Sequence, residues 1–267
     1  MLKLNKTERL LQRFAIKLQA RILKAEEATK ETLPSGLVPM STILKPGKSG
    51  KVRIENYEVS GLNAQLYNLQ LALGNTPEMA ITPGSYTRLI VDEEVMMSDA
   101  PYEARSNVDI IEGARGDVLI AGLGMGMVLI PILLKKSVRS VFVVEKNRDV
   151  IKLVWPCIKK WREHQGMVGA KPAPLVLEEG SIFDWTPPMV PLKQKFDVIY
   201  FDIWPTISKK NLVDANILKK QFKKYLKPGG WMGVWVEKEI RERKNREAKE
   251  LARLRAKNDS KRNASGC

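Results

Sequence analysis

The sequence predicts an α/β protein with a doubly wound, mostly parallel sheet that carries helices on both faces. Two observations predict this fold class. From about residue 116 onwards, strand-like apolar segments alternate with helix-like segments, and a glycine-rich turn, Gly122 to Gly126, follows the first of these strands. Repeated β-then-α units favour a parallel sheet, because each crossover must return the chain with the same hand to the next strand.

Five strands and three helices are expected in this region. Each strand is a short apolar run, and each helix has apolar residues at three- and four-residue steps. Pro131 lies inside the first helix and should bend it, because proline cannot donate the main-chain hydrogen bond to Met127. The expected strands are Val118–Ala121, Val141–Glu145, Leu175–Glu178 (leading into the turn GSIFDW), Phe196–Asp202 and Trp231–Val236, and the expected helices are Met125–Lys136, Asn147–Glu163 and Asn211–Leu226.

An extension of mixed character precedes this region. Apolar residues recur at helical spacing over Lys3–Thr32, which predicts an amphipathic helix ended by LPSG. KVRIENYEVSGLN favours short strands, and Leu62–Leu73 favours a helix closed by Gly74. Further along, YTRLIVDEEVMMSD predicts two strands joined at Asp92-Glu93, and PYEARSNVDIIEGA predicts a helix with Pro101 in its first turn.

Four segments organise the chain. Its 267 residues, 44% of them hydrophobic, can bury one sizeable core. We expect a basic amphipathic helix at 1–33, an extension with short strands and a hairpin at 34–100, a ligand-binding α/β domain at 101–236, and a basic helix and tail at 237–267. The tail should be a solvated helix that frays towards its end.

The charge is strongly positive and concentrated at the two ends. Of the formal net charge of +15, residues 1–33 carry eight basic against four acidic side chains and residues 237–267 carry eleven against six. Such ends attract polyanions, so they could bind nucleic acid, although solvated charged helices have the same composition. The sequence predicts no oligomeric state.

Cysteine content and hydropathy favour a soluble protein of the reducing cytosol. Cys157 and Cys267 are too few and too far apart for a disulfide framework or a cysteine-based metal site. The N-terminal residues lack the apolar core of a signal peptide. The uncharged run Val118–Leu134 has 17 residues, near the lower limit for a membrane span, but three glycines and Pro131 argue against that interpretation. No membrane association is therefore expected.

The glycine turn is the first candidate for ligand binding. In an open parallel sheet, ligands bind beyond the carboxyl ends of the strands, and Gly122 and Gly124 would let a ligand approach the main chain. The turn does not match the dinucleotide fingerprint G-x-G-x-x-G, because Met127 stands where the third glycine belongs. A P-loop is excluded because no Gly-Lys-Ser/Thr follows.

Two carboxylates follow neighbouring strands of the predicted sheet. Glu145 ends the second strand, where Rossmann-like folds present an acid to the ribose hydroxyls. Asp202 ends the fourth strand beside Trp204, where it could orient or deprotonate a nucleophile. The structural alternatives are that Glu145 points into water and that Asp202 caps the following turn.

The ordered segments VLIAGLGMG, VFVVEKN, EEGSIFDW, KFDVIYFDIW and LKPGGWMGV resemble class I S-adenosylmethionine-dependent methyltransferases, and most of all their spermidine synthase-like branch. The resemblance covers roughly 88–237. In that branch a β-hairpin and a helix precede the glycine turn, and VDEEVMMSDAPYEARSN is similar in placement and in its Asp, Tyr and Glu content.

The resemblance implies S-adenosylmethionine as the cofactor and assigns residues to it. Gly122, Gly124 and Gly126 would lie against its methionine and ribose, and Glu145 would hold the ribose. Ser181, Ile182 and Asp184 would border the adenine. Asp202 would face the reacting group as the catalytic residue, and Asp99, Tyr102, Glu103 and Trp204 are the candidates for substrate contact.

The sequence also departs from the family. Ser181 stands where an acidic residue is common, and Met125 stands where polyamine synthases commonly have Asp. The family normally adds two strands after the fifth, so the sheet is either shortened or completed by N-terminal strands. DIWP replaces the Asp-Pro-Pro-Tyr or Asn-Pro-Pro-Tyr sequence used on the exocyclic amines of DNA bases, which argues against that reaction.

Other chemistries lack residues. The only histidine, His164, sits in a polar run at a helix end. We therefore expect it at the surface and expect no nucleophile that depends on a histidine. Ligands for zinc or di-iron are missing, and no metal is expected. Most of the six tryptophans should fill core, with Trp204 the candidate substrate platform.

Three functions remain open at the level of sequence. The first is an S-adenosylmethionine-dependent methyltransferase whose acceptor, a small molecule or a nucleic acid, cannot be read from the residues. The second is transfer of an aminopropyl group to a polyamine. The third is a non-catalytic scaffold of the same fold that binds nucleic acid or protein through its basic ends, which Met125 and Ser181 favour.

Overall fold

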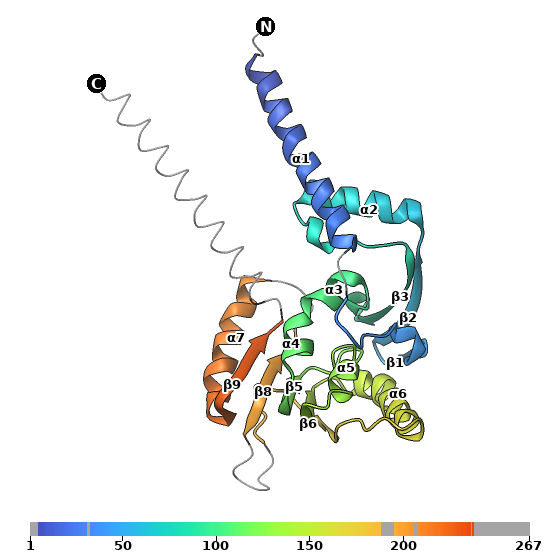
Figure 1. Cartoon of the computed structure of the whole chain (residues 1–267), viewed down its shortest axis with the longest axis vertical. Coiled ribbons are helices and arrows are strands. Elements are labelled where there is room, and N and C mark those ends of the chain that lie inside the picture. The colour runs from blue at the N-terminus through green and yellow to red at the C-terminus, as the bar shows by residue number, and fades with distance from the viewer. Residues whose placement is uncertain (1–4, 31–32, 188–194, 205–207, 236, 238–267) are drawn as a thin grey trace, which may run out of the picture.

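A computed structural model describes residues 5–30, 33–187, 195–204, 208–235 and 237 of the chain (Figure 1). Five strands form a wholly parallel sheet in the order β7-β6-β5-β8-β9. In chain order this is 3-2-1-4-5, the order of a doubly wound fold with its switch point beside the first strand. The predicted fold class is confirmed. The strands are β5 Gly116–Ala121, β6 Val138–Glu145, β7 Leu175–Glu179, β8 Phe196–Phe201 and β9 Leu226–Val234.

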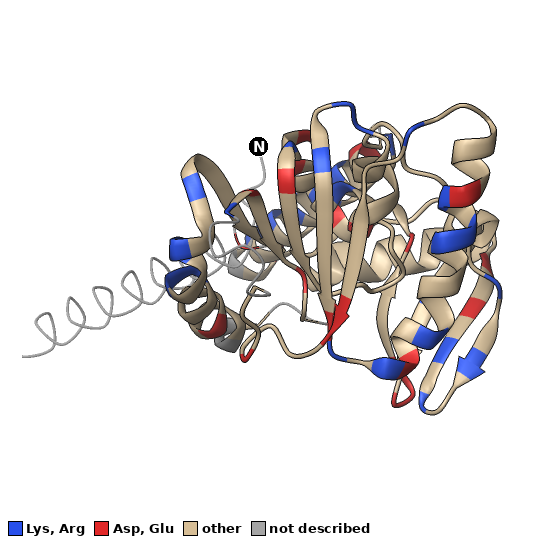
Figure 2. Cartoon of the chain, turned by 90° about the horizontal axis from the view of Figure 1, so that it is seen from below, with Lys and Arg blue, Asp and Glu red and all other residues tan. Residues whose placement is uncertain are grey.

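Alternate residues of the central strand β5 face the two layers of helices. Val118 and Ile120 belong to a core shared with helices α4, α5 and α6, whereas Leu119 and Ala121 belong to a core shared with α7. In Figure 2 the strands of this sheet are mainly tan, and the charged residues lie mostly on helices, loops and strand ends. The helices are α3 Pro101–Ser106, α4 Val108–Gly113, α5 Leu129–Leu133, α6 Arg148–Met167 and α7 Lys209–Phe222.

The helix after the glycine turn is much shorter than predicted. We expected Met125–Lys136, but α5 spans only Leu129–Leu133. Gly126 has φ +78°, which is outside the helical region, so the turn continues past it before the helix can begin. Pro131 therefore lies in a helix of little more than one turn.

Two other predicted boundaries are wrong. The single helix expected after Pro101 divides at Asn107, whose side chain donates to the Glu103 carbonyl and accepts from the Tyr200 hydroxyl. The last predicted helix ends at Phe222, and a 3-10 turn, η3 Lys223–Tyr225, leads directly into β9. That strand begins at Leu226 rather than Trp231 and passes through the Pro-Gly-Gly segment with a register shift.

The N-terminal extension forms its own antiparallel sheet, in the order β1-β2-β3-β4. Asp92 and Glu93 join β3 to β4 with φ of +51° and +66°, the positive values that a tight hairpin turn requires. The predicted hairpin is confirmed. This sheet does not extend the parallel sheet, which among the described residues keeps five strands. The strands are β1 Gly47–Ser49, β2 Val52–Val59, β3 Gly84–Val91 and β4 Glu94–Ser98.

Two longer helices and two short 3-10 turns complete the extension. Helix α1, Lys6–Lys30, matches the predicted N-terminal helix, and α2, Gly61–Gly74, matches the helix predicted at 62–73. The 3-10 turns are η1 Met40–Thr42 and η2 Pro77–Met79. Helix α1 packs on α2 and η2 through its C-terminal half and projects away from the body with the rest (Figure 1).

The basic tail expected at 237–267 lies outside the described residues, apart from Glu237, which pairs with Lys219 of α7. None of the helices that the structure describes is long and apolar enough to cross a membrane.

Candidate functional site

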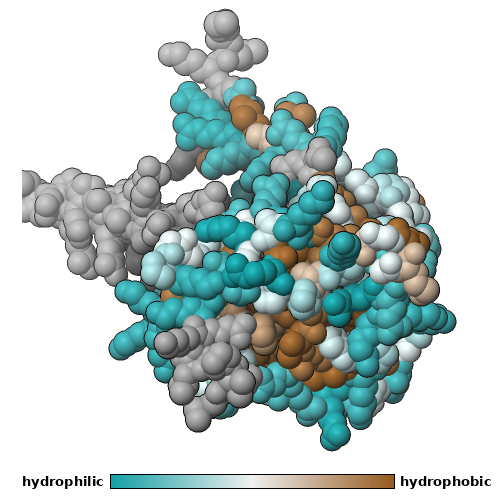
Figure 3. Space-filling view, turned by 60° about the horizontal axis from the view of Figure 1, so that its bottom comes forward, coloured by the Kyte–Doolittle hydropathy of each residue, from teal (hydrophilic) through white to brown (hydrophobic). Residues whose placement is uncertain are grey.

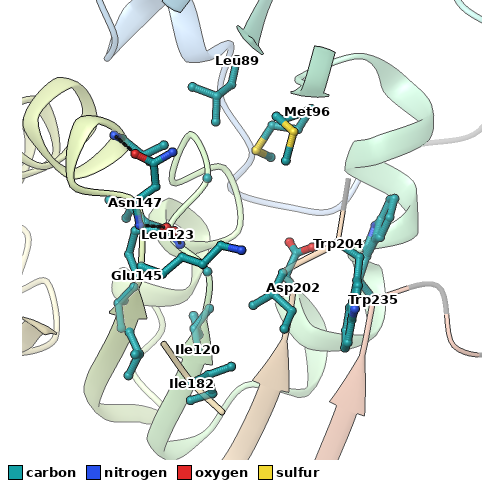
Figure 4. Close-up of a pocket in the computed structure, with 18 of the residues that line it drawn as sticks. Leu89, Met96, Ile120, Leu123, Glu145, Asn147, Ile182, Asp202, Trp204 and Trp235 are labelled. Carbon is teal, nitrogen blue, oxygen red and sulfur yellow. Dashed lines mark hydrogen bonds between the residues drawn. The ribbon is translucent and has the colours of Figure 1, made fainter. Parts of the chain in front are cut away.

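A cavity of about 410 Å³ lies at the carboxyl ends of β5, β6, β7 and β8 (Figure 4). This is the edge at which doubly wound folds bind ligands, and the volume is typical of a small-molecule site. The cavity is closed from the opposite side by the β3–β4 hairpin of the N-terminal extension, through Leu89, Met96 and Met97. Most of its lining is apolar, and it includes four carboxylates: Asp92, Glu103, Glu145 and Asp202.

Two glycines of the turn line the cavity. Gly122 has φ +96°, and a Cβ placed on it would collide with the main-chain oxygen of Asp202. Gly124 has φ +50°, and a Cβ there would lie 2.5 Å from the Met97 sulfur. These residues must be glycine because the turn is left-handed and because another part of the protein lies directly against it.

Gly126, which the resemblance assigns to the cofactor, and the neighbouring Met125 do not line the cavity. A Cβ on Gly126 would lie 2.8 Å from Ile158 of α6, so this glycine permits close packing between the turn and a helix. Met125 is fully buried, and its main-chain N–H points to the Met97 sulfur at 3.2 Å. The position where polyamine synthases commonly have Asp is therefore part of the core here.

Glu145 stands at the end of β6 as predicted and is 8% exposed. Its Oε2 accepts the N–H of Leu123 at 2.8 Å, and its Oε1 accepts the N–H of Asn147 at 2.7 Å. These bonds fix the carboxylate against the glycine turn. Each oxygen keeps lone-pair capacity, so the group can also accept hydroxyl donors from the cavity.

Asp202 follows β8 and lies across the cavity from Glu145. In Figure 4 it stands between Glu145 and the pair Trp204 and Trp235. No described group hydrogen-bonds its carboxylate, so the cap expected of a purely structural Asp is not seen. Burial, and second the nearby Glu145 carboxylate, raise the pKa of Asp202 to about 7.

A third carboxylate, Glu103 of α3, lines the same cavity. Its Oε2 accepts the N–H of Ser98 at 2.7 Å, which ties α3 to the end of the hairpin. Burial raises its pKa to about 8 against the lowering effect of the Ser98 N–H, and Asp202 contributes a further, smaller increase. The cavity thus holds two acids that are poised to gain or lose a proton near neutral pH.

Two other residues of the predicted substrate set, Asp99 and Tyr102, lie elsewhere. Asp99 does not line the cavity, because its oxygens accept the N–H groups of Met40 at 2.7 Å and Thr87 at 2.6 Å. It holds the hairpin to η1. Tyr102 lines a second cavity, between α2 and the antiparallel sheet, which shares Glu103 with the first.

The cavity is completed by the loops after β7 and β8. Ser181 and Ile182 both line it, whereas Asp184 does not and is exposed. Trp204 lines it together with Trp235, whose indole N–H donates to Ser106 Oγ at 2.9 Å. The structure therefore brings eight of the predicted residues together: Gly122, Gly124, Glu145, Ser181, Ile182, Asp202, Trp204 and Glu103.

The sequence alone did not identify four apolar or aromatic residues that line the cavity. Leu89, Met96 and Met97 were assigned only to the hairpin, and Trp235 only to the core. The period-two pattern of β4 predicts which of its residues share a face, but not what that face will contact. The hairpin directly precedes α3, which carries Glu103, and this was the feature of the sequence that could have placed the hairpin near the cavity.

The remaining expectations concern residues away from the cavity. His164 is exposed in the last turn of α6, as predicted. Trp185 is buried in the core and stacks on Phe222, whereas Trp231 is partly buried and stacks on Tyr200. Within the described residues, no three His, Cys, Asp or Glu side chains cluster in a way that could hold a metal ion.

The two raised pKa values predict a pH dependence of stability. Because the folded protein holds the Asp202 and Glu103 protons more tightly than the unfolded chain, their contribution to stability is complete below about pH 4 and is lost as the pH rises through about 7 and 8. The free energy of unfolding in urea should therefore fall between pH 5 and pH 8.5. In the double variant Asp202→Asn, Glu103→Gln, the free energy of unfolding should depend less on pH. The variant Asp184→Asn, which changes an exposed acid, should keep the pH dependence of the wild type. An unchanged slope in the double variant would contradict the assignment.

Comparison with solved structures finds distant matches. No protein-family model matches the chain, and no curated protein matches it. Among solved structures, the chain is similar to an S-adenosylmethionine-dependent methyltransferase from Clostridium acetobutylicum ATCC 824, at 19% identity over 49% of this chain and 48% of that one, with a TM-score of 0.33. It is also similar to spermidine synthase from Thermotoga maritima, at 18% identity over 68% and 53%, with a TM-score of 0.36.

A third match is the S-adenosylhomocysteine-bound methyltransferase PaMTH1 of Podospora anserina, at 17% identity over 51% of this chain and 53% of that one, with a TM-score of 0.35. The chain spans about half the length of these three structures. Matches at these values assign neither a reaction nor a ligand. The chain itself, by its strand order and its layers, has a Rossmann-like doubly wound α/β fold.

Proposed function

We propose that this protein binds S-adenosylmethionine in the cavity at the ends of β5 to β8 and transfers its methyl group to an acceptor held beside Asp202. The observation that carries the proposal is the pairing of a buried, fixed carboxylate with a bare glycine turn. Glu145 is locked against Leu123 by a 2.8 Å bond, directly beside Gly122 and Gly124, whose backbones are exposed to the cavity. An acid and an open main chain in contact suit a ribose with its attached polar chain.

Three residues of the lining would contact the ribose and the base of the cofactor. Glu145 accepts the two ribose hydroxyls with the lone pairs that Leu123 and Asn147 leave free. Ile182 provides an apolar surface for a flat base, and Ser181 can accept from an amino group without contributing charge. The cofactor supplies a methyl group activated by a sulfonium.

Asp202 and the β3–β4 hairpin lie beside the space proposed for the acceptor. With a pKa of about 7, Asp202 can take a proton from a nucleophile at neutral pH and release it afterwards. Met96 and Met97 cover the cavity on the side of the hairpin, which limits the access of water. Most of the rate would come from alignment of the nucleophile with the transferred carbon, because displacement at a methyl group needs an in-line approach.

One observation favours a second candidate, transfer of an aminopropyl group to an amine. Glu103, Asp202 and Glu145 line one cavity, and a cationic amine entering it would favour the ionised forms of these acids and be stabilised by them. Incubation with decarboxylated S-adenosylmethionine and putrescine, followed by mass spectrometry, separates this reaction from methyl transfer. A spermidine product would support the second candidate, whereas its absence from protein that binds S-adenosylmethionine would support the first.

Isothermal titration calorimetry of the full chain with S-adenosylmethionine and S-adenosylhomocysteine tests the proposal. We expect saturable binding of both, at one site per chain. Asp184→Asn, which changes an exposed acid close to the cavity, should bind as the wild type does. Folded protein that releases no heat with either compound would refute the proposal and favour the scaffold hypothesis.

A further inference from the structure

Helix α2 presents an apolar stripe to solvent. It buries Ala64 and Ala72, and four leucines on another part of its surface are between 43% and 65% exposed. Their spacing of four, three and four residues is the spacing by which one helix packs along another. Contiguous exposed apolar surface of this kind marks an interaction site. The stripe consists of Leu62, Leu66, Leu69 and Leu73. One of them, Leu66, also lines the second cavity, between α2 and the antiparallel sheet.

The same helix carries no charge. Its sequence, GLNAQLYNLQLALG, contains no Lys, Arg, Asp or Glu, in a chain with a formal net charge of +15. A partner recognised by charge, such as nucleic acid, would find nothing on α2 to contact. Two copies of a protein this basic repel each other over most of their surface, so a neutral apolar face is where they can approach.

Helix α1 carries a similar stripe, which is buried in the C-terminal half of the helix and exposed in the N-terminal half. The stripe has heptad spacing along the whole helix. In the C-terminal half, Ala25 and Ala28 are buried, and Arg21 donates to the Ala72 carbonyl at 3.3 Å. In the N-terminal half, Leu11 and Phe14 on the same stripe are more than half exposed. Figure 3 shows hydrophobic residues beside hydrophilic ones on this projecting segment. The stripe is Leu11, Phe14, Leu18, Arg21, Ala25 and Ala28.

The two exposed stripes cannot cover each other within one chain. Helix α1 is continuous, and Arg21 fixes its inner half to the C-terminal end of α2, so the outer half leads away from the body (Figure 1). Yet the two surfaces match in length. The outer part of α1, from Lys6 to Leu18, and the 14 residues of α2 each extend roughly 20 Å at 1.5 Å per residue.

We infer that two copies of this chain form a two-fold dimer in which the outer half of α1 of each copy packs on the leucine stripe of α2 of the other. Two-fold symmetry makes the contact twice, so one kind of surface match covers all four exposed stripes. Charge favours this pairing over α1 on α1, because the outer half of α1, from Lys6 to Leu18, has four basic residues against one acidic and would repel its own copy, whereas α2 is neutral. The inference is independent of the proposed function.

Sedimentation velocity and light scattering of the full chain test the inference. The wild type should run as a dimer of the 30.2 kDa chain at high micromolar concentration. Leu62→Glu, Leu69→Glu in α2 and Leu11→Glu, Phe14→Glu in α1 should each weaken dimerisation by about 100-fold or more, because each places charges in a desolvated contact. Gln12→Glu, Gln19→Glu, on the opposite face of α1, makes the same change in charge and should leave the dimer intact.

A mixing experiment distinguishes the reciprocal contact from any other dimer. When the α1 variant is mixed with the α2 variant, one of the two contacts joins an unchanged α1 to an unchanged α2. A heterodimer should therefore form where neither variant dimerises alone. Circular dichroism confirms that the variants are folded, since all four substituted residues are exposed. A wild-type protein that stays monomeric at high micromolar concentration would overturn the inference. If that monomer binds phosphatidylserine vesicles, the stripes contact a lipid surface instead of a second copy. A dimer that survives both variants, or a mixture that stays monomeric, would also overturn the inference.

Discussion

Replacing Glu145 with alanine should weaken the binding of S-adenosylmethionine by at least about 100-fold. The substitution removes the acceptor for two ribose hydroxyls, and hydrogen bonds to a charged group contribute about 1.5–3 kcal/mol each. It also frees the main chain at Leu123, which the carboxylate holds at 2.8 Å, so the glycine turn loses its fixed position. Calorimetric titration of wild type and variant measures the change.

The matched control is Glu179→Ala. Glu179 ends the neighbouring strand β7, as Glu145 ends β6, but its side chain is exposed and does not line the cavity. Its loss should leave the affinity unchanged. Because Glu145→Ala also removes two main-chain contacts, thermal unfolding must show that the variant is still folded at the titration temperature. A folded Glu145→Ala variant with wild-type affinity would remove Glu145 from the site.

Gly122→Ala should lower the free energy of unfolding by about 3 kcal/mol or more. A side chain at φ +96° is strained by about 1–2 kcal/mol. The added methyl group would also collide with the main-chain oxygen of Asp202, which cannot move without pulling the end of β8 away from β5. Overpacking of this kind typically costs about 1–3 kcal/mol. Urea denaturation monitored by tryptophan fluorescence measures the difference.

Gly166→Ala provides the control within the same chain. Gly166 lies in α6, a Cβ there would meet nothing within 4 Å, and its φ is not positive. Alanine has the higher helix propensity, so this variant should gain up to about 1 kcal/mol. Equal stability of Gly122→Ala and wild type would mean that the turn can adopt another conformation.

The sequence by itself determined the parallel sheet and the chemistry at its edge. Buried strands such as β5 and β8 read as apolar runs, and their carboxyl ends meet at one edge because the strands are parallel. Glu145 and Asp202 each end such a strand, and Gly122 follows another, so their meeting at one cavity could be predicted. The hairpin turn at Asp92 and Glu93 was likewise a local property.

Only the tertiary structure decided what closes that edge. Met97 lies against Gly124, and Glu103 lies across from Asp202, although 27 residues separate the first pair and 99 the second. Local periodicity defines which residues share a face, but the contact a face makes depends on how separate elements pack. Gly126 shows the same limit, because its contact is with Ile158 of α6 rather than with the cavity. The break at Asn107 also follows from a tertiary contact, because its buried side chain accepts from the Tyr200 hydroxyl of β8.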